Sequence, residues 1–181
     1  MLVISRNIHI QAPVERVFAL MADPAARSAL APQARPIRVE IEGGGLLHAG
    51  SICHFRLQAD NRVLDYRTRV REFLPNQRIA LVSDSAVPFE IVLETRPQNG
   101  GTWLTHTERF EPEEEMLRLA LPPTPVDAVM EEICRWLPLL DPEYAARVRR
   151  GREEMLEQKL GENLEHWLDA IKQRLEVAQP V

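Results

Sequence analysis

Apolar and polar residues alternate along most of the first 111 residues, with the period typical of β-strands that bury one face. This pattern predicts strands at residues 2–11, 37–41, 50–59, 63–74, 78–83, 88–96 and 102–111. From residue 37 onward, short segments rich in Gly, Pro and Asn separate consecutive strands. Neighbouring strands joined by short turns favour an antiparallel meander.

Between the first two strands the apolar residues change to a helical period. Pro13 opens a segment in which four apolar side chains share one helical face: Val14, Val17, Phe18 and Met21. Asp23 and Pro24 then combine a capping side chain with a proline at the first helical position. We therefore expect two short helices here, the second at residues 25–30.

A much longer helix is predicted at the end of the chain, over residues 141–177. Its apolar residues recur mostly at steps of three, four or seven and form one stripe: Tyr144, Val148, Met155, Leu160, Leu164, Trp167, Leu168, Ile171 and Leu175. Glycine lowers helix propensity, so we expect a bend near Gly151 and place the C-terminal helix of the domain at residues 151–177. The stripe can cover one face of the sheet.

The segment at residues 112–150 lies between the last strand and this helix. The sequence Pro-Pro-Thr-Pro at residues 122–125 predicts a rigid extended link, and the apolar spacing after it predicts a helix from Val126 to Trp136. An exposed apolar face needs a partner. Two arrangements stay open: the insertion packs on its own domain as a lid, or it makes a homodimer contact.

Composition narrows the class of protein. The chain has 181 residues, of which 45% are apolar and 27% charged, which suits one globular domain at residues 1–181. The net charge of −5 argues against a nucleic-acid-binding protein, which needs a basic face. Cys53 and Cys134 have neither metal-binding nor redox spacing, so free thiols are expected. The N-terminus lacks the pattern of a secretory signal, and no apolar run is long enough to span a membrane, which favours a cytoplasmic protein.

Four short motifs carry a resemblance to a known superfamily. They are IHIQAPVERVF at residues 8–18, LLHAGS at 46–51, VREFLPNQRI at 70–79 and GTWLTH at 101–106. Each motif is degenerate, but their order and spacing resemble the START-like or SRPBCC superfamily, and within it the polyketide cyclase/dehydrase-like group. The likeness covers residues 3–111 and 152–176. In the simplest members the last strand runs almost directly into the helix, so the insertion at residues 112–150 is a departure.

The resemblance implies an α+β fold of the helix-grip type. A curved antiparallel sheet of about seven strands would wrap around the long C-terminal helix, with two short helices after strand 1 and a helical insertion before the last helix. It also implies a cavity between sheet and helix that holds a hydrophobic small molecule. The residues expected to bind this ligand are Tyr66, Phe89, Ile91, Leu93, Leu104, His106, Leu164, Trp167, Leu168 and Ile171.

Polar residues inside such a cavity are the candidates for chemistry. His106 and Glu108 are two residues apart on one face of the last strand, where they can form an acid–base pair. The structural alternatives place His106 on the outer face and Glu108 at the rim. Tyr66 either donates a hydrogen bond to a ligand carbonyl or anchors the sheet. His54 and Arg56 alternate with the more apolar residues of their strand, so we expect them to point outward.

No metal, cofactor or nucleophile motif accompanies these residues. The sequence has no His-x-x-x-His, Cys-x-x-Cys, Glu-x-x-His or Gly-x-Ser-x-Gly arrangement, so no metal and no cofactor are expected. Three functions stay open. The first is binding of a lipid, a polyketide or an isoprenoid-like molecule. The second is a cyclase/dehydrase-type enzyme that uses His106, Glu108 and Tyr66, and the third is a homodimeric interaction module without a ligand. Fold analogy alone does not choose among them.

Overall fold

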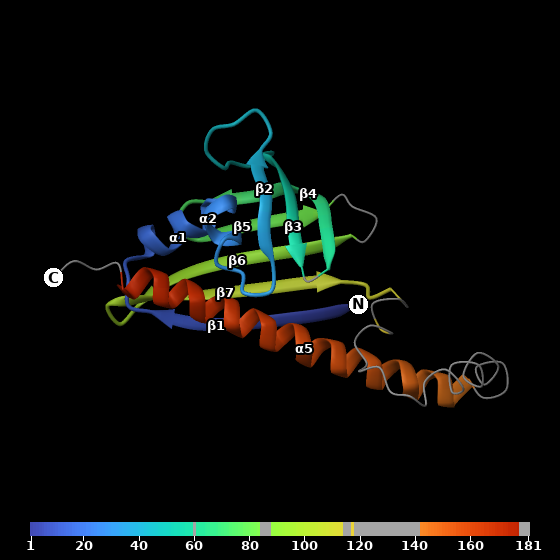
Figure 1. The fold of residues 1–181 in the computed structure, drawn as a ribbon. Coiled ribbons are helices and arrows are strands. Elements are labelled where there is room, and N and C mark those ends of the chain that lie inside the picture. Colours follow the sequence, from blue (N-terminus) through green and yellow to red (C-terminus); the bar gives the residue numbers. More distant parts are fainter. Residues whose placement is uncertain (60, 84–87, 114–116, 118–141, 178–181) are drawn as a thin grey trace.

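The computed structural model describes residues 1–59, 61–83, 88–113, 117 and 142–177 (Figure 1). The elements are β1 (Leu2–Ile10), α1 (Val14–Ala22), α2 (Pro24–Ser28), β2 (Arg35–Ile41), β3 (Ile52–Ala59), β4 (Arg62–Leu74), β5 (Arg78–Ser83), β6 (Phe89–Gln98), β7 (Gly101–Phe110) and α5 (Pro142–Val177). The predicted α+β class is confirmed, and so is the predicted order of strands and helices within the described ranges.

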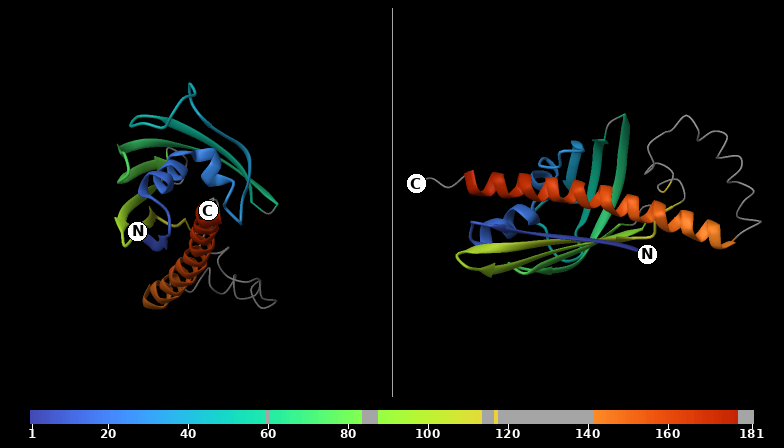
Figure 2. Two further views of the ribbon diagram at one scale, coloured as in Figure 1. Left: turned by 90° about the vertical axis from the view of Figure 1, so that its left-hand side faces the viewer. Right: turned by 90° about the horizontal axis from the view of Figure 1, so that it is seen from below.

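The seven strands form one antiparallel sheet in the order β1-β7-β6-β5-β4-β3-β2. Consecutive strands pair from β2 to β7, whereas β1 pairs with β7 from Leu2 opposite Phe110 to Ile10 opposite Thr102. Figure 2 shows the sheet curving around α1, α2 and the C-terminal part of α5. A curved sheet around a long C-terminal helix is the predicted helix-grip fold, which is thereby confirmed.

The turn between β6 and β7 fixes the register of these two strands. Asn99 and Gly100 have φ of 52° and 73°, the left-handed conformation that a two-residue hairpin turn requires at both positions. Asn and Gly adopt this conformation at lower cost than other residues. The resulting register places His106 of β7 opposite Leu93 of β6 and Arg6 of β1.

Two register shifts change which side chains face the helices. In β2 the pairing shifts between Pro36 and Arg38, and Ile37 is 54% exposed although its spacing in the sequence predicts the same face as Val39 and Ile41. In β4 the pairing shifts between Val70 and Glu72. Beyond that shift Phe73 faces α1, where its ring lies 5.4 Å from the ring of Phe18.

Helix α5 begins at Pro142 and continues without interruption through Gly151 and Gly161 (Figure 1). The helix predicted over residues 141–177 is therefore confirmed, and the boundary placed at residue 151 does not divide it, because the assigned helix has no break at Gly151. At Gly161 the missing side chain has a packing role, because a Cβ there would collide with the guanidinium of Arg6 on β1. Arg6 Nε bonds Glu165 Oε1 at 2.6 Å, which ties α5 to β1.

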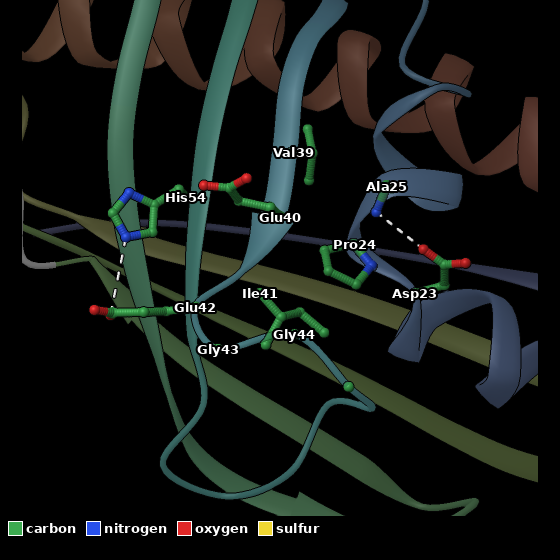
Figure 3. A pocket seen from close by; sticks show the side chains of 11 residues that line it. Asp23, Pro24, Ala25, Val39, Glu40, Ile41, Glu42, Gly43, Gly44 and His54 are labelled. Atoms are coloured by element: carbon green, nitrogen blue, oxygen red, sulfur yellow. Dashed lines mark hydrogen bonds and ion pairs between the residues drawn. The ribbon is translucent and has the colours of Figure 1, made fainter.

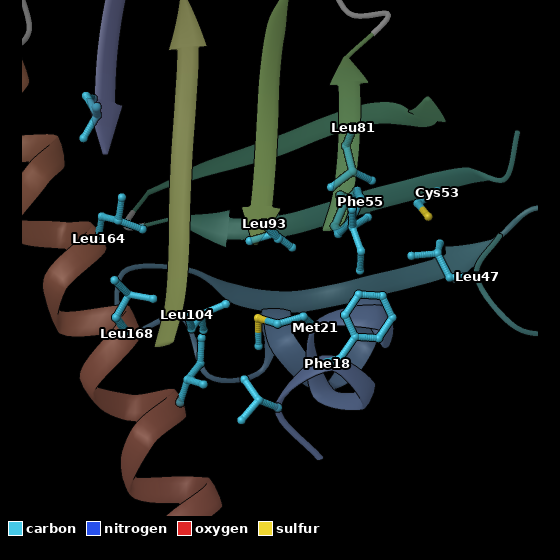
Figure 4. Packing of buried hydrophobic residues seen from close by; sticks show 14 of the residues in the cluster. Phe18, Met21, Leu47, Cys53, Phe55, Leu81, Leu93, Leu104, Leu164 and Leu168 are labelled. Carbon is cyan, nitrogen blue, oxygen red and sulfur yellow. The ribbon is translucent and has the colours of Figure 1, made fainter. Parts of the chain in front are cut away.

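The core lies between the inner face of the sheet and the three helices (Figure 4). Leu164 and Leu168 of α5 pack toward Leu104 of β7, and the apolar layer continues through the other strands to α1. Its further members in Figure 4 are Leu93, Leu81, Phe55, Cys53, Leu47, Met21 and Phe18. Sheet and helix thus share one core, and neither would be buried without the other.

Several expectations concern residues outside the described ranges. The extended link at residues 122–125, the helix from Val126 to Trp136, and Cys134 all lie there, so the lid and homodimer arrangements stay predictions. Cys53 is a buried free thiol. None of the helices in the described ranges is long and apolar enough to cross a bilayer.

Candidate functional site

A cavity of about 240 Å³ lies between the inner face of the sheet and helices α2 and α5. We call it the sheet–helix cavity. Four strands each contribute two side chains that are two residues apart, because alternate residues of a strand point to the same face: Phe55 and Leu57, Tyr66 and Thr68, Ile91 and Leu93, His106 and Glu108. The rest of the wall consists of Leu81, of Arg27, Ser28, Ala31 and Gln33 in and after α2, and of Leu160, Asn163, Leu164 and Trp167 on α5.

His106 and Glu108 form a close imidazole–carboxylate pair in the wall of this cavity. His106 Nε2 lies 3.0 Å from Glu108 Oε1, and the two side chains are 6% and 33% exposed. Burial alone raises the pKa of the Glu108 carboxyl, but the neighbouring imidazole lowers it by more, so the pKa lies below its usual value. Within the described ranges Nδ1 of His106 has no hydrogen-bond partner, whereas Nε2 faces the Glu108 carboxylate. The ring therefore keeps hydrogen-bonding capacity at Nδ1.

Tyr66 belongs to an aromatic cluster on the same wall. Its ring stacks on Phe55 at 5.1 Å with an interplanar angle of 10°, and it meets Phe89 edge-to-face at 5.6 Å. Burial raises the pKa of the Tyr66 hydroxyl to about 12, while the charge of Arg27 lowers it and that of Glu108 raises it. The hydroxyl therefore stays protonated at neutral pH and can donate a hydrogen bond.

The rim of the cavity joins α5 to the segment around α2. Trp167 Nε1 donates to the carbonyl oxygen of Arg27 at 3.0 Å, and the indole lies edge-on to the His106 ring at 5.0 Å. Gln33 Nε2 donates to Asn163 Oδ1 at 3.2 Å. Opening this side of the cavity would require α2 and its following loop to separate from α5.

Arg27 is a cavity residue that the sequence analysis missed. Only 7% of the residue is exposed, and its Nη1 donates to the carbonyl oxygen of Met21 at 3.0 Å, at the end of α1. The guanidinium carbon lies 5.9 Å from the centre of the Phe55 ring. Burial lowers the pKa of the guanidinium, but arginine remains charged at physiological pH. No pattern in the sequence reveals this position, because the small residues beside Arg27 have no periodicity that would define a buried face.

Comparison with known families agrees with this geometry. The family model described as "Polyketide cyclase / dehydrase and lipid transport" matches residues 1–138, which include every strand of the sheet and the first two helices. The chain belongs to this family. The resemblance found in the four sequence motifs is thereby confirmed.

Solved structures share the fold of this polyketide cyclase/dehydrase family member over nearly the whole chain. Protein CV1439 of Chromobacterium violaceum has a TM-score of 0.62 and 15% identity, over 97% of this chain and 99% of that chain. Protein TTHA0849 of Thermus thermophilus has a TM-score of 0.60 and 15% identity, over 98% and 99%. A Polyketide_cyc-like protein of Corynebacterium glutamicum has a TM-score of 0.55 and 16% identity, over 99% of this chain and 96% of that chain. At these identities the likeness extends to the fold alone. No curated protein sequence matches the chain.

The structure divides the predicted ligand-binding residues of this family member into two groups. The first group lines the sheet–helix cavity and consists of Tyr66, Ile91, Leu93, His106, Leu164 and Trp167. The second group does not line the cavity: Leu104, Leu168 and Ile171 are buried in the core, and Phe89 packs against the Tyr66 ring. His54 and Arg56 lie outside the cavity wall, and Arg56 is exposed, as expected.

A second, larger hollow of about 570 Å³ lies on the surface between α2, β2 and the glycine-rich segment at residues 43–45 (Figure 3). Its polar groups already bind other groups of the protein. Asp23 Oδ1 accepts hydrogen bonds from the backbone of Ala25 and Ala26, and His54 Nε2 lies 3.9 Å from Glu42 Oε2. Most of the lining residues are exposed, so a ligand there would lose little contact with water. This hollow is the weaker candidate.

The chemistry available to the site follows from these groups. Within the described ranges, no group of three or more His, Cys, Asp or Glu side chains is arranged to hold a metal ion. The sheet–helix cavity offers apolar walls for binding, the paired His106 and Glu108 for proton transfer, and Tyr66 as a hydrogen-bond donor. These are the components of an apolar binding site and of metal-independent acid–base chemistry.

Proposed function

We propose that this member of the polyketide cyclase/dehydrase and lipid transport family binds a hydrophobic small molecule in the sheet–helix cavity. The observation that carries the proposal is the cavity of about 240 Å³, whose mainly apolar walls bring a few polar groups together. Small-molecule sites generally have this composition. The family description favours a lipid or a polyketide, and an isoprenoid-like compound has the same apolar character.

The size of the cavity limits the ligand and its affinity. At about 30 Å³ for each water-sized group, the cavity holds roughly eight such groups. Burial of eight methylene groups at about 0.8 kcal/mol each contributes roughly 6 kcal/mol before the entropic cost of association is subtracted. We therefore expect dissociation constants of roughly 40 µM or weaker for ligands that make apolar contacts alone.

Native mass spectrometry of protein purified from cells tests this proposal, with the released small molecules identified. Leu160 lines the cavity on α5, so Leu160→Trp should fill the cavity and exclude the ligand. Met155→Trp adds the same side chain to the same helix at an exposed position outside the cavity, and this variant should retain the ligand. The proposal is wrong if the wild-type protein carries nothing and its Tm is unaffected by a panel of lipids and aromatic compounds.

A cyclase/dehydratase-type enzyme is a second candidate, supported by the 3.0 Å pair of His106 and Glu108 in the cavity wall. In this mechanism neutral His106 takes a proton from a carbon next to a ligand carbonyl, and Glu108 stabilises the imidazolium that forms. Tyr66 donates a hydrogen bond to the carbonyl oxygen as negative charge develops there. The resulting enolate attacks a second carbonyl of the same ligand to close a ring. The imidazolium protonates the alkoxide that ring closure leaves. His106 then removes a second proton from the same carbon and delivers it to the new hydroxyl, which leaves as water while the C=C bond forms.

Turnover of a flexible polyketone distinguishes the enzyme from the binding protein. His106→Gln should abolish ring closure while ligand binding and Tm change little, and Glu108→Gln should reduce the rate by roughly 100- to 10,000-fold. His54→Gln is the matched control, because His54 lies outside the cavity wall. Equal rates for wild type and His106→Gln would remove this candidate and leave the binding proposal standing.

A further inference from the structure

The charge of Arg27 in the wall of the sheet–helix cavity lacks a direct partner of opposite sign. Its observed contacts are a hydrogen bond to the Met21 carbonyl oxygen at 3.0 Å and the face of the Phe55 ring at 5.9 Å. Within the described ranges Arg27 makes no ion pair with a carboxylate. A buried guanidinium without an anion beside it is unfavourable, because burial reduces the hydration of its charge.

The two acidic residues that act on this region are occupied elsewhere. Asp23 Oδ1 accepts from the backbone N–H groups of Ala25 and Ala26 at 3.0 and 2.9 Å, where it caps the start of α2. Glu108 is held 3.0 Å from His106 Nε2. Neither carboxylate is therefore placed to neutralise Arg27 by direct contact.

We propose that Arg27 binds the carboxylate of an amphipathic monoanion whose apolar part fills the rest of the sheet–helix cavity. This inference rests on the proposed function and names the ligand class. A guanidinium presents five N–H donors in a planar fork that matches a carboxylate, and the Met21 carbonyl occupies one of them. Thr68, which lines the same cavity beside the Cys53 thiol, has a hydroxyl that supplies a further donor. Because Glu108 already brings negative charge to this cavity, a single negative charge fits better than a dianion.

The apolar wall extends from the Arg27 side of the cavity to α5. Figure 4 shows Leu81, Leu93 and Leu164 in sequence across the sheet from β5 to the helix, and all three line the cavity. The volume for roughly eight water-sized groups matches a carboxylic acid of about eight carbons. Octanoate and 1-octanol form a matched pair of probes, since they share the chain and differ in the charged end.

Isothermal titration calorimetry with octanoate and with 1-octanol tests the proposal on four proteins: wild type, Arg27→Met, Arg27→Lys and Arg56→Met. Wild type should bind octanoate at least about tenfold more tightly than octanol, because hydrogen bonds to a charged group are the stronger kind. Arg27→Met should weaken octanoate binding by roughly 10- to 100-fold and leave octanol binding nearly unchanged. Arg27→Lys keeps the positive charge but lacks the planar guanidinium fork, so its affinity for octanoate should lie between those of wild type and Arg27→Met. Arg56 is exposed on β3 outside the cavity, so Arg56→Met should behave as wild type.

Each outcome decides the proposal. If wild type binds octanol as tightly as octanoate, the proposal is overturned and the proposed function stands. If wild type binds neither compound, the proposal is also overturned, and ligand recovery from wild type and Leu160→Trp decides the proposed function separately. If circular dichroism shows that Arg27→Met does not fold, the wild-type preference and the Arg27→Lys variant carry the test. Equal octanoate affinity for Arg27→Lys and wild type, together with no wild-type preference for the acid, would refute the role of Arg27.

Discussion

Replacement of the two glycines of α5 by alanine is expected to affect stability differently, although both lie inside the same helix. Alanine in place of glycine in a helix interior stabilises by about 1 kcal/mol, because glycine loses more backbone freedom. At Gly151 a new Cβ meets no described atom within 4 Å, so Gly151→Ala should give the whole gain. In a chain of 181 residues this corresponds to a rise in Tm of about 2–4 °C.

At Gly161 the same substitution should give a smaller gain. The new Cβ collides with the Arg6 guanidinium, which must move away from Glu165 and give up the contact of 2.6 Å between Nε and Oε1. The two side chains are 32% and 55% exposed, and partly exposed pairs of this kind contribute about 0.2–1 kcal/mol. Gly161→Ala should therefore raise the free energy of unfolding by only roughly 0 to 0.8 kcal/mol.

A double-mutant cycle isolates this coupling. Urea unfolding followed by circular dichroism gives the free energy of unfolding for wild type, Gly161→Ala, Arg6→Ala and the double variant, with Gly151→Ala as the matched control. In the Arg6→Ala background, Gly161→Ala should recover the full gain of about 1 kcal/mol. The packing argument would be refuted if Gly161→Ala stabilised wild type as much as Gly151→Ala does, or if Arg6→Ala left the effect of Gly161→Ala unchanged.

Three further substitutions test the buried core, the turn between β6 and β7, and the pair of His106 and Glu108. Leu168→Ala should lower the free energy of unfolding by about 2–5 kcal/mol, because Leu168 is 1% exposed; a loss below about 1 kcal/mol in urea would contradict its place in the core. Gly100→Ala should cost about 1–2 kcal/mol, because Gly100 has φ of 73°; unchanged thermal unfolding would count against that conformation. Burial raises and His106 lowers the pKa of Glu108, and the folded value lies below the usual value near 4.5. The contribution of Glu108 to stability is therefore present above that value and is lost as pH falls through the folded pKa. In urea titrations, the difference in free energy of unfolding between wild type and Glu108→Gln should shrink from pH 6 to pH 3. A difference that does not change with pH would exclude this linkage.

The strands and helices of the described part could be predicted because their signals are local. Alternation along a strand and the helical spacing along α5 follow directly from which face each element buries. Features that depend on pairing between strands could not be read in this way. The exposure of Ile37 results from the register shift between Pro36 and Arg38, which no alternation in the sequence reveals. The span of α5 from Pro142 to Val177 matches the predicted range 141–177, whereas the boundary placed at Gly151 gave glycine propensity more weight than the surrounding helix warrants.

The cavity could be predicted only in part. Period two places His106 and Glu108 on one face of β7, but β7 lies between β1 and β6 and is largely buried on both faces, so the sequence could not show which face meets the helix. The apolar stripe of α5 likewise predicts which residues are buried, but not whether each lines the cavity or packs in the core. Leu164 reaches the cavity, whereas Leu168, about one helical turn further along the stripe, lies in the core. The place of Arg27 in the cavity wall could not be predicted from the sequence, because a charged side chain among small residues is usually solvated. It became visible only from the packing of α2 against the sheet.

The pairing of β1 with β7 also determines the order in which this chain can fold. During synthesis the first strand emerges long before its partner, because Leu2 lies opposite Phe110 and Ile10 opposite Thr102. Until residue 110 has left the ribosome, β1 is an unpaired strand whose apolar side chains have no sheet to cover them. Helix α5, which ties to β1 through Arg6 and Glu165, is made later still. Closure of the loop between such distant segments makes folding slow, so the nascent chain is exposed to chaperones and to aggregation for most of its translation.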